Sequence, residues 1–322
     1  MEQPRCVALT GIDTFFGRRL IESLSAHSDR VRLIGLGSHD RSRPASGLQA
    51  HRVDLSEPGV ASQIAEILGK EQADTLVHLA FKSLPSADRD ADYQSDVAGS
   101  LEVLNACALA NVRRLIIPST TMCYGARLEN PHQLREDAAL HGHDGAHWVS
   151  HRVEVERAVA RFRESHPDRE VTVLRHCWIM GPRFVDSFVR YFDSDWVPTL
   201  LGHDPLLQFV HEDDLLALFE RSILESHPGV FNVVGDGVLP LSGYLRLAGK
   251  RNLALPQMLL SATGGSPIPL SSSDSVDGFY DYLKYMWVAS GDRAREEFGP
   301  LTYTSREAWT AMVSARRLQR YR

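Results

Sequence analysis

The sequence predicts an α/β fold: a doubly wound parallel sheet followed by a smaller C-terminal lobe. Short apolar runs typical of buried strands alternate with helical patterns through the first half of the 322 residues. A glycine-bearing turn, residues 10–17, directly follows the first of these runs. After Gly181-Pro182 the pattern becomes irregular and turn-rich. Since alternating strands must be joined by crossovers, we expect helices on both faces of a parallel sheet and ligands at the strands' carboxyl ends.

The expected elements follow one another regularly along the chain. The first helix carries Phe16, Leu20 and Leu24 at every fourth position, which is the spacing of one helix face. The expected strands are 6–9, 31–36, 74–80, 115–117 and 171–174, and the expected helices begin near 16, 97 and 148, the last two ending near 109 and 162.

Composition and charge exclude several classes of protein. A hydrophobic content of 43% and a charged content of 24% are typical of a globular protein with a large core. The net charge of -6 argues against a nucleic-acid partner. Four scattered cysteines without a C-x-x-C pair indicate buried thiols in a reducing compartment. Since no apolar stretch approaches the ~20 residues that cross a bilayer, we expect a cytoplasmic protein without a membrane anchor.

The first turn has the order strand, glycine turn, helix that suits a phosphate. Gly11 and Gly17 would allow a tight turn and close packing of the helix on the strand, while the helix N-terminus offers free N–H groups to a pyrophosphate. Thr14 stands where the middle glycine is expected. The phosphate contact must therefore be looser, or the threonine hydroxyl must itself donate a hydrogen bond. A merely structural turn is the alternative.

The end of the second strand bears on the choice of cofactor. Gly37 occupies the position where an acidic residue would bind the adenosine ribose hydroxyls. Without that carboxylate a 2′-phosphate is not repelled, and Arg41 or Arg43 could pair with it. This favours NADP slightly over NAD. A solvated basic loop is an equally good explanation of the arginines.

Further motifs extend along nearly the whole chain. Besides the glycine loop, they are Val53-Asp54-Leu55, His78-Leu79-Ala80, Ser119 to Gly125, Leu174-Arg175 with Gly181-Pro182, Gln208 to Asp214, and Val230 to Val233. In these motifs the chain resembles the short-chain dehydrogenase/reductase (SDR) superfamily, in its extended or atypical branch of NAD-dependent epimerase/dehydratase proteins. The resemblance implies a Rossmann-like dinucleotide-binding domain at 1–178 with a returning segment at about 207–236. It implies a substrate lobe at 179–206 and 237–322.

The resemblance also implies where a dinucleotide and a substrate would bind. The expected cofactor contacts are Gly11, Asp13, Thr14, Phe15, Phe16, Gly17, Asp54, Leu55, Leu79, Ala80, Lys82 and His151. Related proteins often act on nucleotide-linked sugars, and atypical branches include sterol and lignan-type substrates; the sequence does not choose among them. Arg183, Trp196 and His203 are candidates for the substrate cleft.

The catalytic residues depart from the family pattern. In the family a Ser or Thr polarises the substrate oxygen, a Tyr exchanges the proton, and a Lys four residues later lowers the Tyr pKa and binds the nicotinamide ribose. Thr120 holds the hydroxyl position, but the Tyr and Lys positions fall on His147 and His151, with the usual serine intact at Ser150. Tyr124 is a second-choice proton donor that could reach the pocket rim.

Three hypotheses follow from this replacement. Loss of both groups removes the family's ordinary acid-base chemistry, so the protein would bind a dinucleotide as a possible pseudoenzyme, for binding, sensing or partnering. Alternatively, it is an active oxidoreductase, epimerase (isomerase) or dehydratase in which His147 transfers the proton with Thr120, and His151 bonds the ribose. A metal site among residues 141–151 is the weakest hypothesis, because a loop of solvated histidines explains them better.

Several other residues have structural explanations. Either Asp213 or Asp214 is expected to cap a helix, and Arg175 and Asn232 could stabilise the join between the lobes. The helices near 97–109 and 148–162 correspond to the pair that forms a four-helix dimer interface in similar proteins, so a homodimer is expected. Burial in the monomer is the other explanation of their apolar residues, Leu101, Leu104, Leu109, Val149, Val153 and Val159.

Overall fold

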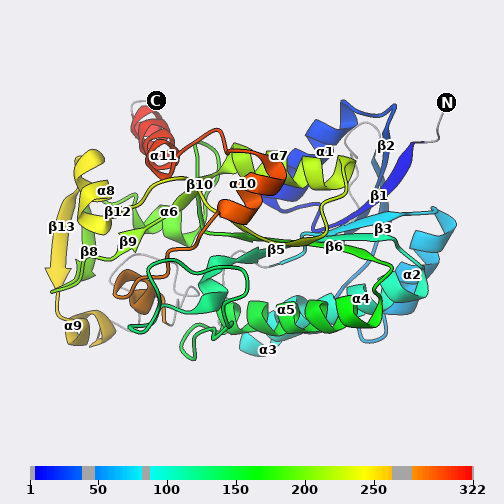
Figure 1. Ribbon diagram of the computed structural model, residues 1–322, viewed down its shortest axis with the longest axis horizontal. Coiled ribbons are helices and arrows are strands. Elements are labelled where there is room, and N and C mark those ends of the chain that lie inside the picture. The colour runs from blue at the N-terminus through cyan, green and yellow to red at the C-terminus, as the bar shows by residue number, and fades with distance from the viewer. Residues whose placement is uncertain (1–3, 38–47, 82–87, 263–277, 321–322) are drawn as a thin grey trace.

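One seven-stranded sheet organises the molecule, in the order β11-β6-β5-β4-β1-β2-β3 (Figure 1). The computed structural model describes residues 4–37, 48–81, 88–262 and 278–320. Every ladder of this sheet is parallel. Its strands are β1 (Arg5–Thr10), β2 (Val31–Gly37), β3 (Leu48–Arg52), β4 (Thr75–His78), β5 (Arg114–Thr120), β6 (Glu170–His176) and β11 (Gly229–Val233). The chain order reverses between β1 and β4, which places the ligand crevice of such a sheet above these strands.

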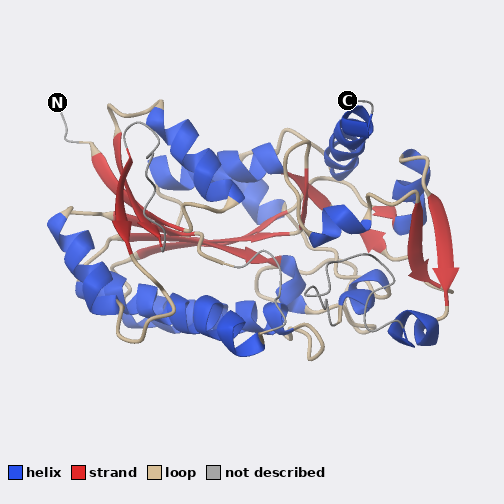
Figure 2. Cartoon of the chain, turned by 180° about the vertical axis from the view of Figure 1, so that it is seen from behind, coloured by secondary structure: helices blue, strands red, loops and turns tan. Residues whose placement is uncertain are grey.

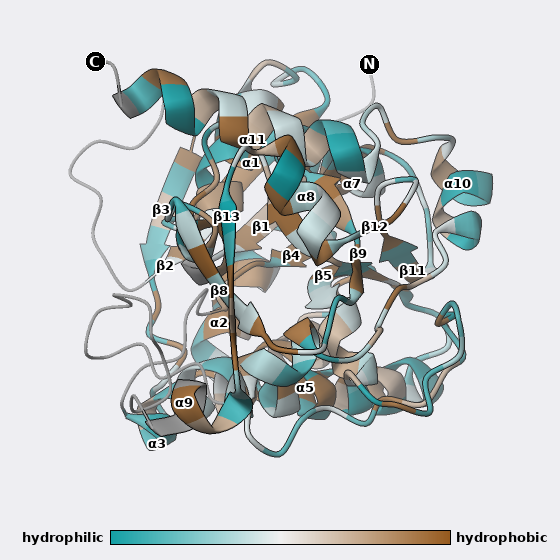
Figure 3. Cartoon of the chain, turned by 90° about the vertical axis from the view of Figure 1, so that its left-hand side faces the viewer, coloured by the Kyte–Doolittle hydropathy of each residue, from teal (hydrophilic) through white to brown (hydrophobic). Residues whose placement is uncertain are grey.

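Helices cover both faces of the sheet, as the alternating pattern predicts (Figures 1 and 2). One face carries α1 (Phe15–Ser25) and α7 (Glu212–Leu224); the other carries α2 (Ala61–Lys70), α4 (Gly99–Leu109) and α5 (His147–Ser165). The buried apolar side chains accordingly form two clusters, one under each layer of helices. The central strands β1 and β4 are buried along almost all of their length, whereas the edge strand β3 is largely hydrophilic (Figure 3).

The segments after β6, apart from α7 and β11, form the smaller lobe at one end of the sheet. This lobe contains three two-stranded sheets, in which β7 pairs with β10, β9 with β12, and β8 with β13. Their strands are β7 (Trp178–Met180), β8 (Trp196–Leu200), β9 (Leu206–Leu207), β10 (Phe209–His211), β12 (Leu239–Pro240) and β13 (Arg251–Leu255). The remaining helices are α3 (Arg89–Tyr93), the π-helix η1 (Gln94–Ala98), the 3₁₀ turns η2 (Thr121–Tyr124) and η3 (Phe279–Leu283), α6 (Ser187–Tyr191), α8 (Leu241–Leu247), α9 (Gln257–Ala262), α10 (Asp292–Phe298) and α11 (Ser305–Arg320).

The predicted fold class is confirmed, and the departures from it are local. The helix α2 was not among the expected elements, and the helix expected from residue 97 is preceded by a π-turn over Gln94–Ala98. The returning segment expected at about 207–236 contributes β11 to the main sheet. The division of the chain into two domains stays a prediction. All four cysteines are buried free thiols. Within the described residues, no helix combines the length and apolarity needed to span a membrane.

Candidate functional site

The glycine loop lies where β1 meets α1, above the sheet. Gly11 has φ of +65°, and a Cβ on it would lie 2.5 Å from the carbonyl carbon of Leu79 at the end of β4. A Cβ on Gly17 would lie 2.2 Å from the carbonyl oxygen of Gly11. Both positions therefore require glycine, one for the turn and one for the close packing of α1 on the loop. The tight turn and close packing expected from the sequence are both present.

Thr14 caps the helix that begins after the loop. Its Oγ1 donates to the carbonyl of Gly11 at 2.7 Å and accepts from the amide of Gly17 at 3.0 Å. The single hydroxyl proton is thus used inside the loop, which corrects the expectation that Thr14 might donate to a phosphate. The N–H groups of Phe15 and Phe16, in the first turn of α1, have no acceptor within an α-helix and can serve an anion instead.

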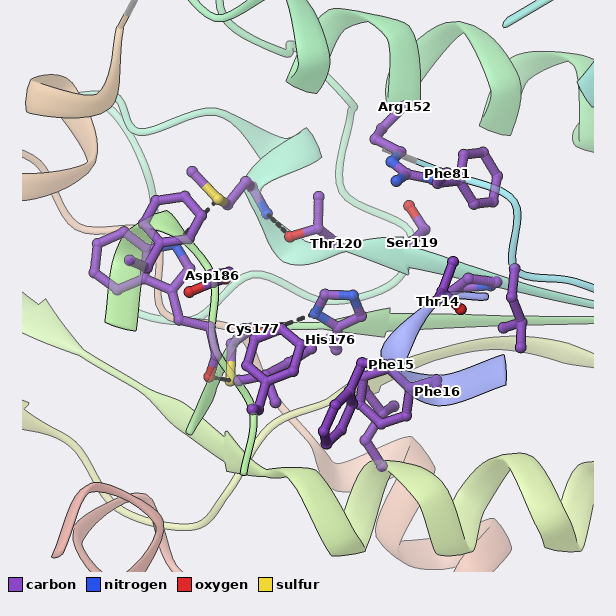
Figure 4. A pocket seen from close by; sticks show the side chains of 18 of the residues that line it. Thr14, Phe15, Phe16, Phe81, Ser119, Thr120, Arg152, His176, Cys177 and Asp186 are labelled. Atoms are coloured by element: carbon purple, nitrogen blue, oxygen red, sulfur yellow. Dashed lines mark hydrogen bonds between the residues drawn. The ribbon is translucent and has the colours of Figure 1, made fainter. Parts of the chain in front are cut away.

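A pocket opens beside this loop at the carboxyl ends of the strands (Figure 4). The glycine loop contributes Thr14, Phe15 and Phe16 to the lining of the pocket. The segment that follows β4 contributes Leu79 and Phe81. The other polar lining residues come from the ends of β5 and β6, from α5 and from the start of α6: Ser119, Thr120, Trp148, Arg152, His176 and Asp186. The pocket thus joins the expected phosphate loop to the expected catalytic strand.

The face that α5 presents to the pocket differs from the expected one. Trp148 and Arg152 line the pocket, whereas His147 and His151 do not. One residue along an α-helix turns the side chain by about 100°, so the two pairs lie on adjacent faces. The ring of His151 packs edge-on against Tyr93 of α3, at 5.5 Å between centroids. The sequence pattern predicted His147 and His151 over the cleft. In the structure the residues one position later, Trp148 and Arg152, line it instead.

Arg152 is a partly buried cation in this pocket. Its guanidinium lies 3.5 Å from the ring centroid of Phe81, a cation–π contact that Figure 4 shows beside Ser119. Its Nη1 is buried and has no hydrogen-bond partner in the part of the chain that the structure describes. Burial lowers the Arg152 pKa from its usual value. A guanidinium keeps its charge even so, and this one can donate hydrogen bonds to an anionic or hydroxyl ligand.

Thr120 and His176 stand side by side at the ends of neighbouring strands. They are register partners of β5 and β6, and both line the pocket. Thr120 Oγ1 accepts from the amide of Met122 at 3.3 Å, which leaves its proton for a substrate oxygen. His176 Nδ1 donates to the carbonyl of Cys177 at 2.8 Å, so the lone pair of the neutral ring is on Nε2. Burial lowers the pKa of His176 to about 4, which keeps the ring neutral at pH 7.

Asp186 is the acidic group of the same pocket. It caps α6, and its Oδ1 accepts from the amide of Val189 at 2.8 Å. Burial raises the pKa of Asp186 to about 7, with the Arg190 charge opposing. A carboxyl group that titrates near neutrality is suited to exchanging a proton.

Tyr124 does not reach the pocket, which corrects its candidate role. Its side chain is fully buried, and its hydroxyl donates to Asn232 at 2.8 Å and accepts from Arg175 at 2.7 Å. Arg175 also pairs with Glu156 at 2.7 Å. Burial raises the Tyr124 pKa to about 12. Arg175 and Asn232 thus belong to a buried network under the site, consistent with their structural explanation.

The remaining expected cofactor positions lie just after β3 and β4. Asp54, after β3, is exposed and accepts hydrogen bonds from the amide and hydroxyl of Ser56, which lower its pKa. Leu55 packs against Gly99 at the start of α4, and the amide of Ala80 donates to Thr10 at 3.3 Å. Lys82, Arg41 and Arg43 lie outside the described residues.

Other expected ligands lie elsewhere. Among the described residues, no group of three His, Cys, Asp or Glu side chains could hold a metal ion; His143 is bonded to Asp281 at 2.8 Å. None of the three candidate substrate residues lines the pocket. Arg183 pairs with Glu212, Trp196 lies under Arg251, and His203 lies beside Tyr285.

The expected capping by an aspartate is wrong. His211 caps α7, and its Nδ1 accepts from the amide of Asp213 at 3.1 Å. Asp214 instead accepts from the amides of Thr302 and Tyr303, which attaches the C-terminal segment to α7.

Sequence reasoning missed, among other residues of the pocket, four that carry polar groups: Trp148, Arg152, His176 and Asp186. The i, i+4 spacing of Trp148 and Arg152 was visible in the sequence and matches the Tyr-to-Lys spacing one residue later. No local signal distinguishes His176 and Asp186, since their roles depend on burial.

Comparisons with known proteins agree with this geometry. The model of the NAD dependent epimerase/dehydratase family matches residues 7–233. The uncharacterized protein Rv0501 of Mycobacterium tuberculosis is 28% identical over 305 residues, covering 92% of this chain and 80% of that protein. A dTDP-glucose 4,6-dehydratase of Bacillus anthracis in complex with NAD superposes with a TM-score of 0.72 at 12% identity, covering 98% of each chain. A UDP-glucose 4-epimerase of Thermotoga maritima with UDP-glucose gives 0.71 at 14% identity, covering 98% of this chain and 99% of that one.

Proposed function

This chain belongs to the NAD-dependent epimerase/dehydratase family, and we propose that it binds a nicotinamide dinucleotide while lacking the family's usual tyrosine and lysine. The dinucleotide would lie across the carboxyl ends of β1, β4 and β5. In this proposal the protein acts by binding, as a sensor or a partner subunit, rather than by ordinary hydride-transfer chemistry.

The residues at the crevice fit a dinucleotide. Gly11 and Gly17 leave no room for a Cβ, and the first-turn amides of α1 offer donors to a pyrophosphate. Arg152, at the lysine position shifted by one residue, can donate to ribose hydroxyls from the far side of the pocket. When bound, the nicotinamide would supply a hydride acceptor or donor.

The observation that carries the proposal is the pair Trp148 and Arg152 on the pocket face of α5. An indole only donates a hydrogen bond, and a guanidinium does not lose its proton in proteins. Neither can exchange a proton with a substrate as a phenol does beside an ammonium group. The pocket therefore keeps binding groups where the family keeps its proton shuttle.

The test is to identify what purified protein releases on denaturation, and then to measure NAD and NADP binding by calorimetry. We expect a bound or titratable dinucleotide and no change in reduced-nicotinamide absorbance across a panel of nucleotide sugars and other hydroxyl or keto compounds. Failure to bind either dinucleotide would refute the binding function. Turnover of any compound in the panel would refute the loss of chemistry.

A second candidate is an active epimerase, dehydratase or oxidoreductase with altered acid-base residues. The observation favouring it is that Thr120, His176 and Asp186 line one pocket, so a substrate oxygen held by Thr120 would share the pocket with an imidazole and a carboxyl group. His176 and Asp186, rather than His147, would then exchange the proton. A nucleotide-linked sugar is the substrate class to test first, because similar structures contain UDP-glucose or belong to enzymes named for dTDP-glucose.

A homodimer through α4 and α5 belongs to the same proposal. Leu101 and Leu109 of α4 are exposed, whereas the other four apolar candidates are buried in the monomer. Two exposed leucines on one helix support an interface. Light scattering at micromolar concentration tests it, and a monomeric mass would refute it. Cytoplasmic location also stays a prediction.

A further inference from the structure

The end of β2 lacks a side chain at the position closest to the expected ribose site. In folds of this topology, a carboxylate about twenty residues after the glycine loop binds the ribose hydroxyl of NAD. Here β2 ends at Gly37. A Cβ built on Gly37 would lie 3.1 Å from Ile12 and 4.0 Å from Oδ2 of Asp13. The carboxylate of Asp13 therefore borders the space that a side chain at position 37 would enter.

The glycine loop fixes the backbone at Asp13. Asp13 lies two residues after Gly11, and its carbonyl accepts from Arg18 Nη1 at 2.5 Å. The amide N–H of the following residue, Thr14, donates a hydrogen bond to the Gly11 carbonyl at 2.9 Å. Asp13 is also an exposed residue. A side chain at position 37 would compete with Asp13 for the same space. Gly37 therefore leaves room there for the carboxylate of Asp13.

We propose that Asp13 replaces the missing carboxylate of β2, binds the 2′- and 3′-hydroxyls of the adenosine ribose, and thereby selects NAD over NADP. This inference rests on the proposed function. A carboxylate only accepts hydrogen bonds, which suits a diol, and its charge repels a 2′-phosphate. The proposal reverses the preference for NADP that followed from Gly37 in the sequence, because the carboxylate comes from a different loop.

Calorimetry on the full chain with NAD and NADP tests the selection. We expect the unmodified protein to bind NAD at least about tenfold more tightly than NADP, since hydrogen bonds to a charged group are stronger than neutral ones and the same charge repels a 2′-phosphate. Asp13→Asn should weaken NAD binding and bring the two affinities together. Asp13→Arg should favour NADP. Glu22→Gln, which removes the same charge from an exposed position of α1, should leave the ratio unchanged.

The outcomes separate this inference from the proposed function. If both dinucleotides bind but Asp13→Asn leaves their ratio unchanged, or if the unmodified protein prefers NADP, the inference is wrong and the binding function stands. If neither dinucleotide binds, both are wrong. Circular dichroism and thermal unfolding of each variant, with the Glu22→Gln protein as reference, exclude misfolding as the cause.

Discussion

Thr120 and His176 are register partners on β5 and β6, and both side chains open into the pocket that begins at the glycine loop. Partnered residues on adjacent strands point to the same side of the sheet. The hydroxyl that the family uses to polarise an oxygen therefore has a neutral imidazole as its neighbour, while α5 faces both with Trp148 and Arg152. This arrangement places groups that bind a ligand and groups that titrate in one pocket, and their roles can be tested residue by residue.

The first prediction concerns the face of α5. Arg152→Met should lower dinucleotide affinity about tenfold, because the buried guanidinium is the cation that this helix presents to the pocket. Its free energy of unfolding should change by less than about 1 kcal/mol, since loss of the contact with Phe81 is offset by removal of a buried charge. Calorimetry and denaturant unfolding measure the two effects.

The control is a double variant, His147→Ala with His151→Ala. It should retain dinucleotide affinity within about threefold, because neither ring lines the pocket. If the double variant loses binding and Arg152→Met does not, α5 presents the face expected from the sequence.

The second prediction concerns Gly17. Gly17→Ala should destabilise the protein by about 3 kcal/mol or more, because its Cβ would lie 2.2 Å from a backbone oxygen, which cannot move like a flexible side chain. Gly69→Ala is the matched control in α2, where a Cβ would meet nothing within 4 Å and should stabilise by about 0.5–1 kcal/mol. Urea unfolding compares the two; similar losses for both variants would contradict the close packing of the loop.

The sequence predicted the sheet and the glycine loop because their signals are local. Alternation of apolar runs and helical spacing specifies a parallel sheet, and the steric need for glycine at 11 and 17 follows from one turn. The same local reasoning failed on α5. Ser150 suggested a register for the family motif, but the rotation of a helix is set by what packs on it, here Val149 and Val153 against the core.

The chemical groups of the pocket depend on burial, which the sequence alone does not give. His176 and Asp186 look ordinary in the chain, and burial in the folded protein is the largest cause of the shift in each pKa. Asp13 shows the same limit. The sequence identified the missing carboxylate at Gly37, but the neighbouring carboxylate is evident only once the loop is folded.

The third prediction concerns the buried network below the pocket. Arg175→Met should destabilise the protein by about 3–5 kcal/mol, because it leaves the Glu156 carboxylate buried without its cation. Adding Glu156→Gln should recover part of the loss. Arg127→Met, at an exposed pair with Glu129, should cost under about 1 kcal/mol. Denaturant unfolding of the three proteins decides, and equal losses for Arg175→Met and Arg127→Met would show that burial does not strengthen the pair.

The last prediction follows from Asp186. Burial raises its pKa to about 7, against an ordinary value of 3.8, so the folded state favours the protonated carboxyl. Below about pH 4 the group is protonated in both states and costs nothing. As pH rises from 4 to 7 the unfolded chain ionises first, so folding loses stability, by a few kcal/mol in all, and the loss is complete above pH 7. Asp186→Asn keeps an oxygen for the Val189 amide and removes the titration. It should therefore raise the free energy of unfolding clearly at pH 8 and little at pH 4.5, and an equal gain at both values would show that Asp186 does not titrate in this range.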